Sequence, residues 1–354
     1  MDPGHGLIET DAVVIGAGPV GLFQVFELGL LEIKAHVIDS LGVAGGQCVE
    51  LYAGKPIYDI PGVPMCTAQQ LIDNLQKQIQ PFGATFHLGQ QVNALARQDD
   101  GRFAIETSLG TRFLAHNVFI AGGSGSFQAR RLRIDGLDAF EQTQVFYRID
   151  EPARFSGKHV VVAGGTDLAL DAAVALAQAG PHRAARVTLV HRRDVFQADP
   201  TLIAQVQELR DAAAIDFVAG QLTGIESGPD GLNAVQVSAG DGSTRSLPLD
   251  ALLVMLGFNP KLGPIADWGL NLERKQILVD TERFETSTPS IFAVGDVNTY
   301  PGKKKLILCG FHEATLAAFG AAARLRPDHP AQLLYTTTSS KLHQLLGVTT
   351  PDAN

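Results

Sequence analysis

The sequence predicts an α/β protein built from two doubly wound nucleotide-binding domains, the second inserted in the first. Three observations predict this fold. Short β-branched runs alternate with helical stretches, a strand–glycine turn–helix–strand unit occurs twice, and each half ends in a strand closed by glycine. One unit turns at Gly16 and the other at Gly164. A duplicated unit of this kind favours three-layer, Rossmann-like domains over a solenoid, whose repeats are far shorter.

The first half is expected to contain one unit and a β-meander. Its elements are a strand at 12–15, a helix at 22–31, a strand at 35–38, meander strands at 92–96, 103–107 and 111–114, and a strand at 118–121. The second half repeats the order with a strand at 160–163, a helix at 168–179, a strand at 186–190, meander strands at 222–226, 234–238 and 243–247, and a strand at 252–256. The glycines that follow each last strand predict one domain from 1–122 with 258–354 and another from 123–257.

Composition excludes several classes of protein. The chain has 354 residues, of which 45% are apolar and 18% charged, so it is neither disordered nor collagen-like. Its net charge of −9 argues against nucleic-acid binding. No apolar run approaches the ~18 residues of a membrane helix, and residues 1–11 do not resemble a secretory signal. We therefore expect a cytoplasmic protein without membrane contact.

The cysteines do not form a redox or zinc motif. Cys48, Cys66 and Cys309 are far apart, and no two have the spacing of a redox pair or a zinc knuckle. A packing role is the expectation for Cys48. No metal site, acid–base pair or Ser/His/Asp arrangement stands out, and His312 with Glu313 is expected only to begin a helix.

A dinucleotide-binding motif follows the first strand. Gly16, Gly18 and Gly21 fit G-x-G-x-x-G, which follows the predicted strand and opens the predicted helix. The first glycine makes the turn, the second lets the backbone approach a pyrophosphate, and the third allows close helix packing. Asp39 ends the next strand, where a carboxylate can accept hydrogen bonds from ribose hydroxyls.

The second glycine turn carries a different pattern. Gly164 and Gly165 are followed by Thr166, a β-branched residue where a phosphate should approach the backbone, so nucleotide binding is expected to be weaker or shifted. The following strand ends in His191-Arg192-Arg193. Arginines at this position can bind a 2′-phosphate, which favours NADP(H) over NAD(H).

Together these residues resemble the thioredoxin-reductase-like flavoproteins across essentially the whole chain. The resemblance rests on residues 16–21, Asp39, 45–47, 58–62, 191–193 and Gly295-Asp296. Within that group the chain is most similar to ferredoxin–NADP reductases of the thioredoxin-reductase type. The closer similarity rests on residues 46–47, 51–52, 55–59, 125–127, 130–132 and a tail at 335–340.

The resemblance implies particular cofactor contacts. FAD would be bound by Gly16, Gly18, Pro19, Gly21, Asp39, Gln47, Tyr52, Val92, Phe127, Asp296 and Thr337, and NADP(H) by Gly164, Gly165, Thr166, His191, Arg192 and Arg193. Tyr52 would stack on one face of the flavin. In a homodimer, the partner's tail would cover the other face at Tyr335, where relatives often carry histidine. The domain 1–122 with 258–354 would then bind FAD, and 123–257 would bind NADP.

The missing cysteine pair limits where electrons can leave. A thioredoxin reductase passes electrons to a close cysteine pair in its nucleotide domain, and this chain has no cysteine between Cys66 and Cys309. A flavin can take two electrons as a hydride and release them singly, so a ferredoxin or flavodoxin is the expected acceptor. Candidate docking residues are the basic clusters Lys303-Lys304-Lys305 and Arg130, Arg131 and Arg133.

The predicted enzyme is thus an FAD-dependent ferredoxin–NADP(+) oxidoreductase, in which the flavin is the redox centre and no side chain is catalytic. Alternatives remain open at this point. The chain could be an NADPH diaphorase that reduces quinones, ferric complexes or oxygen, or a reductase of a separate thiol protein. It could also be a non-catalytic flavin- or NADP-binding protein in which Thr166 has abolished turnover.

Overall fold

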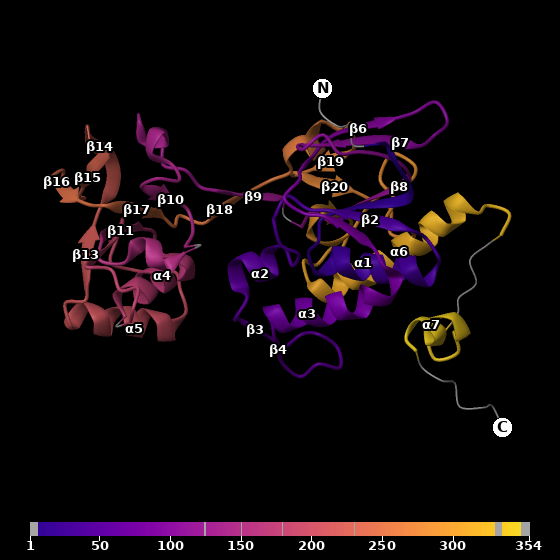
Figure 1. Ribbon diagram of the computed structural model, residues 1–354, viewed down its shortest axis with the longest axis horizontal. Helices are drawn as coiled ribbons and strands as arrows, with labels where there is room; N and C mark the ends of the chain where they lie inside the picture. Colours follow the sequence, from indigo (N-terminus) through magenta and orange to yellow (C-terminus); the bar gives the residue numbers. More distant parts are fainter. Residues whose placement is uncertain are drawn as a thin grey trace. The chain divides into compact units, whose positions relative to one another are not determined.

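The chain forms two compact units, each with its own central sheet, mixed in unit 1 and parallel in unit 2 (Figure 1). The computed structural model describes residues 6–123, 125–149, 151–178, 180–229, 231–329 and 335–347, without the side chains of 126–129, 258–261 and 341. Unit 1 is Met1–Ser126 with Pro260–Asn354, and unit 2 is Phe127–Asn259. Unit 2 is therefore inserted in unit 1, as the sequence predicts. Among the described residues, no helix is long and apolar enough to cross a membrane.

A seven-stranded sheet forms the centre of unit 1. Its strands are β1 (Ile8–Ile15), β2 (Ala35–Ile38), β5 (Thr85–His87), β6 (Val92–Arg97), β7 (Phe103–Thr107), β8 (Arg112–Ile120) and β21 (Ile291–Ala293). They follow the order β5-β2-β1-β8-β7-β6, and β21 pairs with β8. The strands β5, β2, β1, β8 and β21 are parallel, whereas β6 and β7 are antiparallel.

The two strands predicted at 111–114 and 118–121 are one strand, β8, so that prediction is wrong. No glycine or proline separates them, and the backbone therefore continues without a break. The first part of β8 pairs with β7 and its last three residues pair with β21. A strand from the end of the chain is thereby placed beside the middle of the sheet.

Both faces of the first sheet are covered. The helices α1 (Pro19–Leu30), α3 (Ala68–Ile79) and α6 (Ile307–Leu325) cover one face, where Leu22, Ile72 and Ala318 are buried. Phe113 and Ile277 belong to the core on the other face. The remaining elements are short: α2 (Gln47–Tyr52), β3 (Pro56–Ile57), β4 (Cys66–Thr67), η1 (Gln80–Phe82), η4 (Gly263–Asp267), β19 (Leu272–Glu273), β20 (Gln276–Leu278), η5 (Gly295–Val297), β22 (Asn298–Thr299) and α7 (Ser340–Leu345).

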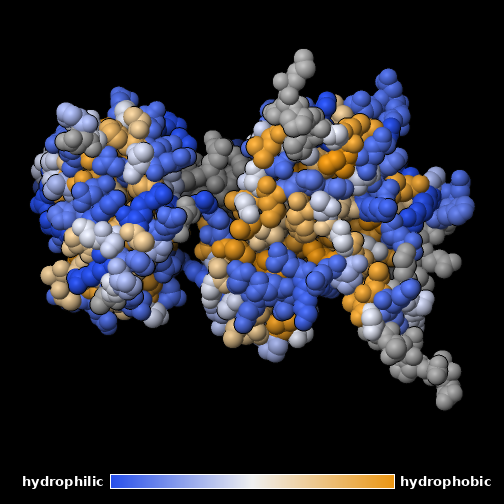
Figure 2. Space-filling model, in the orientation of Figure 1, coloured by the Kyte–Doolittle hydropathy of each residue, from blue (hydrophilic) through white to orange (hydrophobic). Residues whose placement is uncertain are grey.

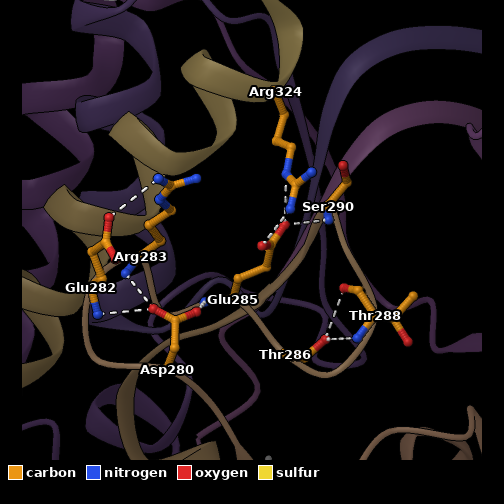
Figure 3. Close-up of polar contacts among 8 residues, drawn as sticks. All are labelled: Asp280, Glu282, Arg283, Glu285, Thr286, Thr288, Ser290 and Arg324. Carbon is orange, nitrogen blue, oxygen red and sulfur yellow. Dashed lines mark hydrogen bonds and ion pairs between the residues drawn. The ribbon is translucent and has the colours of Figure 1, made fainter. Parts of the chain in front are cut away.

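A polar cluster fixes the approach to β21 (Figure 3). The Asp280 carboxylate accepts hydrogen bonds from the backbone N–H groups of Glu282, Arg283 and Glu285. Glu285 in turn accepts two hydrogen bonds from Arg324, in the last turn of α6, and one from Ser290 N. These contacts join the segment before β21 to the last turn of α6.

Unit 2 repeats the arrangement on a smaller scale. Its five parallel strands lie in the order β10-β17-β11-β12-β13, with the bounds β10 (Val145–Phe146), β11 (His159–Ala163), β12 (Arg186–His191), β13 (Ile215–Ala219) and β17 (Ala251–Val254). One face packs on α4 (Asp167–Ala177) and α5 (Pro200–Asp211), and the other on the meander β14 (Gln221–Gly228), β15 (Gly231–Ser238) and β16 (Thr244–Pro248). Two short helices, η2 (Leu137–Phe140) and η3 (Pro152–Phe155), complete it.

Two strands carry the chain between the units. The chain enters unit 2 along β9 (Ser126–Ala129) and leaves it along β18 (Phe258–Lys261). These two strands pair with each other in a two-stranded sheet. The ends of unit 2 therefore lie side by side.

Candidate nucleotide-binding sites

The first glycine loop, residues 16–21, has the geometry that its sequence predicts. Gly16 has φ +113°, and a Cβ there would overlap the Ala121 carbonyl oxygen. A Cβ at Gly21 would overlap the Gly16 carbonyl oxygen. Both positions therefore require glycine, the first for its backbone conformation and both for close contact.

Gly18 differs because it faces open space. A Cβ at Gly18 would meet no atom within 4 Å, and its φ of −71° and ψ of −179° suit any residue. It caps α1, whose first turn begins with Pro19 and receives no side-chain hydrogen bond at its cap. The backbone N–H groups of that turn thus lie beside an open position, which fits the diphosphate of a dinucleotide.

Asp39 is tied to the same loop. Its carboxylate accepts hydrogen bonds from Ala17 N at 2.6 Å and Leu41 N at 2.8 Å, and the residue is 8% exposed. Burial raises the pKa of this carboxyl, and the two backbone hydrogen bonds oppose that rise. Each oxygen keeps a second lone pair. Asp39 therefore orients the loop and still has capacity to accept a bond from a ribose hydroxyl.

A second pair of glycines lies against the loop. Gly45 N donates to Ala17 O at 2.8 Å, and a Cβ at Gly46 would lie 3.1 Å from Gly18 Cα. Gly46 caps α2, which begins at Gln47 and ends at Tyr52. Gln47 is thereby placed beside the open side of the first loop.

The third element at this site is η5, from the end of the chain. A Cβ at Gly310 of α6 would lie 3.3 Å from Gly295 Cα and would overlap Val20 of α1. Asp296 is half-buried, and burial raises its pKa against the lowering effect of Lys303 and Lys305. Burial and the charge of Asp296 also raise the pKa of Cys48 to about 11. The starts of α1, α2 and α6 thus converge with Asp296.

A buried ion pair that sequence reasoning missed supports η5. Glu313 is fully buried and accepts hydrogen bonds from Gly295 N at 2.7 Å, Tyr300 OH at 2.9 Å, Asn298 Nδ2 and Lys303 Nζ. Lys303 also donates to Gly295 O at 2.8 Å, and its side chain is 7% exposed. The expectation that Lys303 belongs to a docking patch is therefore wrong, because its ammonium group is buried in unit 1 and paired with Glu313. Lys304 and Lys305 are exposed.

The other predicted FAD contacts lie in different surroundings. Tyr52 is 40% exposed, with Lys55 Nζ 5.3 Å from its ring centroid. The Val92 side chain is buried in the core, which leaves only its backbone for a cofactor. Phe127 lies in β9, and its side chain is outside the described part of the chain. Thr337 and Tyr335 are exposed in the tail, and no contact described for them reaches the first loop.

The second glycine loop, residues 164–169, repeats the framework of the first. Gly164 has φ +154°, and a Cβ there would overlap the Met255 carbonyl oxygen, as Gly16 relates to Ala121. Thr166 caps α4 with φ −110° and ψ 172°, an extended backbone as at Gly18, and makes no capping hydrogen bond through its side chain. Its side chain therefore occupies the position that Gly18 leaves open.

His191 is packed on this loop. A Cβ at Gly165 would lie 2.6 Å from the His191 ring, and His191 Nδ1 lies 2.8 Å from Arg193 O, to which it donates. Gln197 N donates to Gly165 O at 2.8 Å, and Asp199 N donates to Asp167 Oδ1 at 2.7 Å. The segment after β12 is therefore joined to the loop, and His191 shapes it.

Arg192 and Arg193 are exposed at the end of β12. Among the described residues, no carboxylate forms an ion pair with either of them. Two available guanidinium groups beside a glycine loop fit a 2′-phosphate.

Three comparisons with known proteins agree with this geometry. The model of the pyridine nucleotide-disulphide oxidoreductase family matches residues 10–317. A ferredoxin–NADP reductase of Methylibium petroleiphilum is 62% identical over 98% of this chain and 94% of its own. One from a Polaromonas species is 61% identical over the same shares.

Solved structures share the fold at much lower identity. Thioredoxin reductase from Lactococcus lactis has a TM-score of 0.66 and 23% identity, covering 90% of this chain and 99% of its own. Bacillithiol disulfide reductase from Staphylococcus aureus has a TM-score of 0.68 and 18% identity, covering 91% and 100%. The family's name refers to a disulphide, but all three cysteines of this chain are free thiols. With the match at residues 10–317 and relatives above 60% identity, the chain belongs to the pyridine nucleotide-disulphide oxidoreductases and, within them, to the ferredoxin–NADP reductase family.

Proposed function

We propose that this chain is an FAD-dependent ferredoxin–NADP reductase, in which unit 1 binds FAD and unit 2 binds NADP(H). The observation that carries the proposal is the duplicated glycine loop with opposite charge beside each copy. The first copy has the open position at Gly18 and the carboxylate of Asp39. The second has two available arginines, Arg192 and Arg193.

FAD supplies the conversion between two-electron hydride chemistry and single electrons. The residues of unit 1 bind and orient it. The N–H groups at the start of α1 would bind the diphosphate, Asp39 a ribose hydroxyl, and Asp296 a hydroxyl of the ribityl chain. Gln47 and Tyr52 would lie at the flavin ring. Of the other contacts expected, Val92 would act through its backbone, while Phe127 and Thr337 remain predictions.

The thiol alternatives have little chemical support. Cys48 is beside Asp296, but its pKa of about 11 keeps it as a thiol at neutral pH, and a thiol is a poor nucleophile. All three cysteines are free. Electrons would therefore pass directly to a separate one-electron carrier, a ferredoxin as in the names of the relatives, or a flavodoxin.

We also propose that the chain is a homodimer formed through unit 1, and its cytoplasmic location stays a prediction. The support is the distribution of exposed apolar side chains. Among the described residues, every large hydrophobic side chain with high exposure except Val195 lies in unit 1; examples are Tyr58, Met65 and Leu306. In Figure 2 the part that carries α4 and α5 is mostly hydrophilic on the visible face, while unit 1 shows larger hydrophobic areas. Such areas are typical of interfaces.

Rapid mixing of the FAD-loaded protein with NADPH or NADH tests the proposal. NADPH is expected to bleach the flavin absorbance much faster than NADH. Ferredoxin should then be reduced faster than quinones or ferric complexes at equal concentration. A flavin that stays oxidised would leave only the non-catalytic alternative, and faster reduction of the small acceptors would favour a diaphorase. Light scattering of the same sample measures the oligomeric state.

A further inference from the structure

The residue after the two arginines at the end of β12 is an acid. Asp194 follows Arg193 directly, so its backbone is within about 4 Å of that arginine's Cα. A carboxylate here opposes the role proposed for Arg192 and Arg193. It would attract their guanidinium groups and repel a 2′-phosphate.

Asp194 forms an ion pair with Arg210. Both of its oxygens accept hydrogen bonds from Arg210, each at 2.9 Å, in the two-pronged geometry that arginine forms with carboxylates. Arg210 comes from the last turn of α5, and its side chain is 19% exposed, against 52% for Asp194. The charge of Asp194 is therefore compensated by a residue of another element, the helix α5.

Arg210 is itself held in place. Its guanidinium lies 4.5 Å from the centroid of the Phe217 ring on β13, and Nη1 also donates to Gln207 Oε1 at 3.3 Å. Phe217 contacts Phe196 edge-on, and Phe196 stacks on His191. The contacts with Phe217 and Gln207 restrict the Arg210 side chain, so pairing with Asp194 costs less conformational entropy.

We infer that Arg210 is a specificity-positioning residue, which neutralises Asp194 and so leaves Arg192 and Arg193 available to the 2′-phosphate of NADP(H). The inference rests on the proposed NADP(H) site in unit 2. The role inferred for Arg210 involves no direct contact with the nucleotide. It acts through Asp194, so its effect requires both the acid and the 2′-phosphate.

Calorimetric binding of 2′,5′-ADP and of 5′-AMP to the FAD-loaded protein tests this inference. Arg210→Met is expected to weaken 2′,5′-ADP about fivefold and leave 5′-AMP within twofold, because only the first ligand carries the 2′-phosphate. The double variant Asp194→Asn with Arg210→Met should restore 2′,5′-ADP binding. Arg210→Lys, which keeps the charge, should stay within twofold of the wild type.

The matched control is Arg186→Met. Arg186 begins the same strand β12, at the opposite end from Arg192 and Arg193, and pairs with Asp216 at 2.6 Å. Its loss should therefore change the affinity for neither 2′,5′-ADP nor 5′-AMP. Unchanged 2′,5′-ADP binding in Arg210→Met, or no rescue by Asp194→Asn, would overturn the inference. If Arg210→Met does not fold, Asp194→Asn alone decides: weaker 2′,5′-ADP binding contradicts the inference, and equal or tighter binding supports it. A wild type that does not distinguish the two ligands would instead contradict the proposed function.

Discussion

The two glycine loops share one framework and differ in what they present to a nucleotide. In both, the N–H of the first glycine donates to the strand beside it, Gly16 to Ile38 O and Gly164 to Val190 O. Strand register then makes Asp39 and His191 equivalent positions. Asp39 accepts a hydrogen bond from the loop, whereas His191 packs its ring on the loop and leads into two arginines.

The two loops share the steric requirement for glycine at the turn, and they differ in the charge of the side chains beside it. The loop needs glycine at Gly16 and Gly164 because each approaches a backbone carbonyl too closely for a Cβ. The side chains beside the loop differ between the two copies, because the end of the second strand lies outside that glycine–carbonyl contact. One fold can therefore bind two different dinucleotides.

The largest expected effect concerns the buried pair that supports only the first loop. Lys303→Met would leave Glu313 as an uncompensated buried charge and is expected to destabilise the protein by about 3–5 kcal/mol. Denaturant unfolding measures this, with Lys304→Met as the exposed neighbouring control, which should change stability by less than about 0.5 kcal/mol. Adding Glu313→Gln to Lys303→Met should recover part of the loss. Equal stability of the two lysine variants would show that the pair contributes nothing.

Gly18→Thr makes the first loop like the second. Its backbone conformation and open surroundings accept threonine, so the stability of the apo-protein should stay within about 0.5 kcal/mol. FAD affinity is expected to fall about 10- to 100-fold, the loss of one hydrogen bond to a charged group. Fluorescence titration of the apo-protein with FAD measures this. Unchanged affinity would mean that the diphosphate does not approach Gly18.

The reverse change, Thr166→Gly, tests the second loop. If the threonine side chain obstructs the phosphate, NADPH should bind about threefold tighter, and FAD affinity in unit 1 should not move. Titration with NADPH, with FAD affinity as the internal control, gives the answer. Weaker NADPH binding would instead indicate that the Thr166 hydroxyl contacts the nucleotide.

The smallest expected effect is a pH dependence confined to the edge of the first sheet. His36 and His87 lie 2.9 Å apart between ring nitrogens, and burial lowers the pKa of both, for His36 with the charge of His87 as a second cause. The equivalent edge of unit 2 carries the Arg186–Asp216 pair instead. Since the unfolded state binds protons first, stability should be full above about pH 6.5 and fall as the pH drops below it.

Unfolding between about pH 8 and pH 5 measures the effect. The double variant His36→Gln with His87→Gln should flatten the curve. His159→Gln, at an exposed position on β11, is the control and should leave the curve unchanged. A steeper curve in the double variant would contradict the assignment.

The fold and both loops could be predicted because glycine spacing and strand periodicity are local signals. Gly16, Gly18 and Gly21 complete their G-x-G-x-x-G spacing within six residues. The role of Glu313 could not be predicted, because its partners meet it only after η5 and α6 pack together. A run of three lysines is typical of a solvated surface, and nothing in the sequence distinguishes buried Lys303 from its exposed neighbours. The Arg210–Asp194 pair joins a helix to a turn 16 residues away, with no periodicity to indicate it.

Because β9 and β18 pair with each other, we expect that unit 2 can be replaced as a whole. Its entry and exit run beside each other, so we expect that residues 127–259 can be exchanged for those of a relative without lengthening either connection. Duplication and divergence of nucleotide preference could then proceed in one unit while the other kept its cofactor. If unit 2 binds NADP(H) as proposed, chimaeras joined within these two strands are expected to transfer coenzyme choice together with residues 127–259.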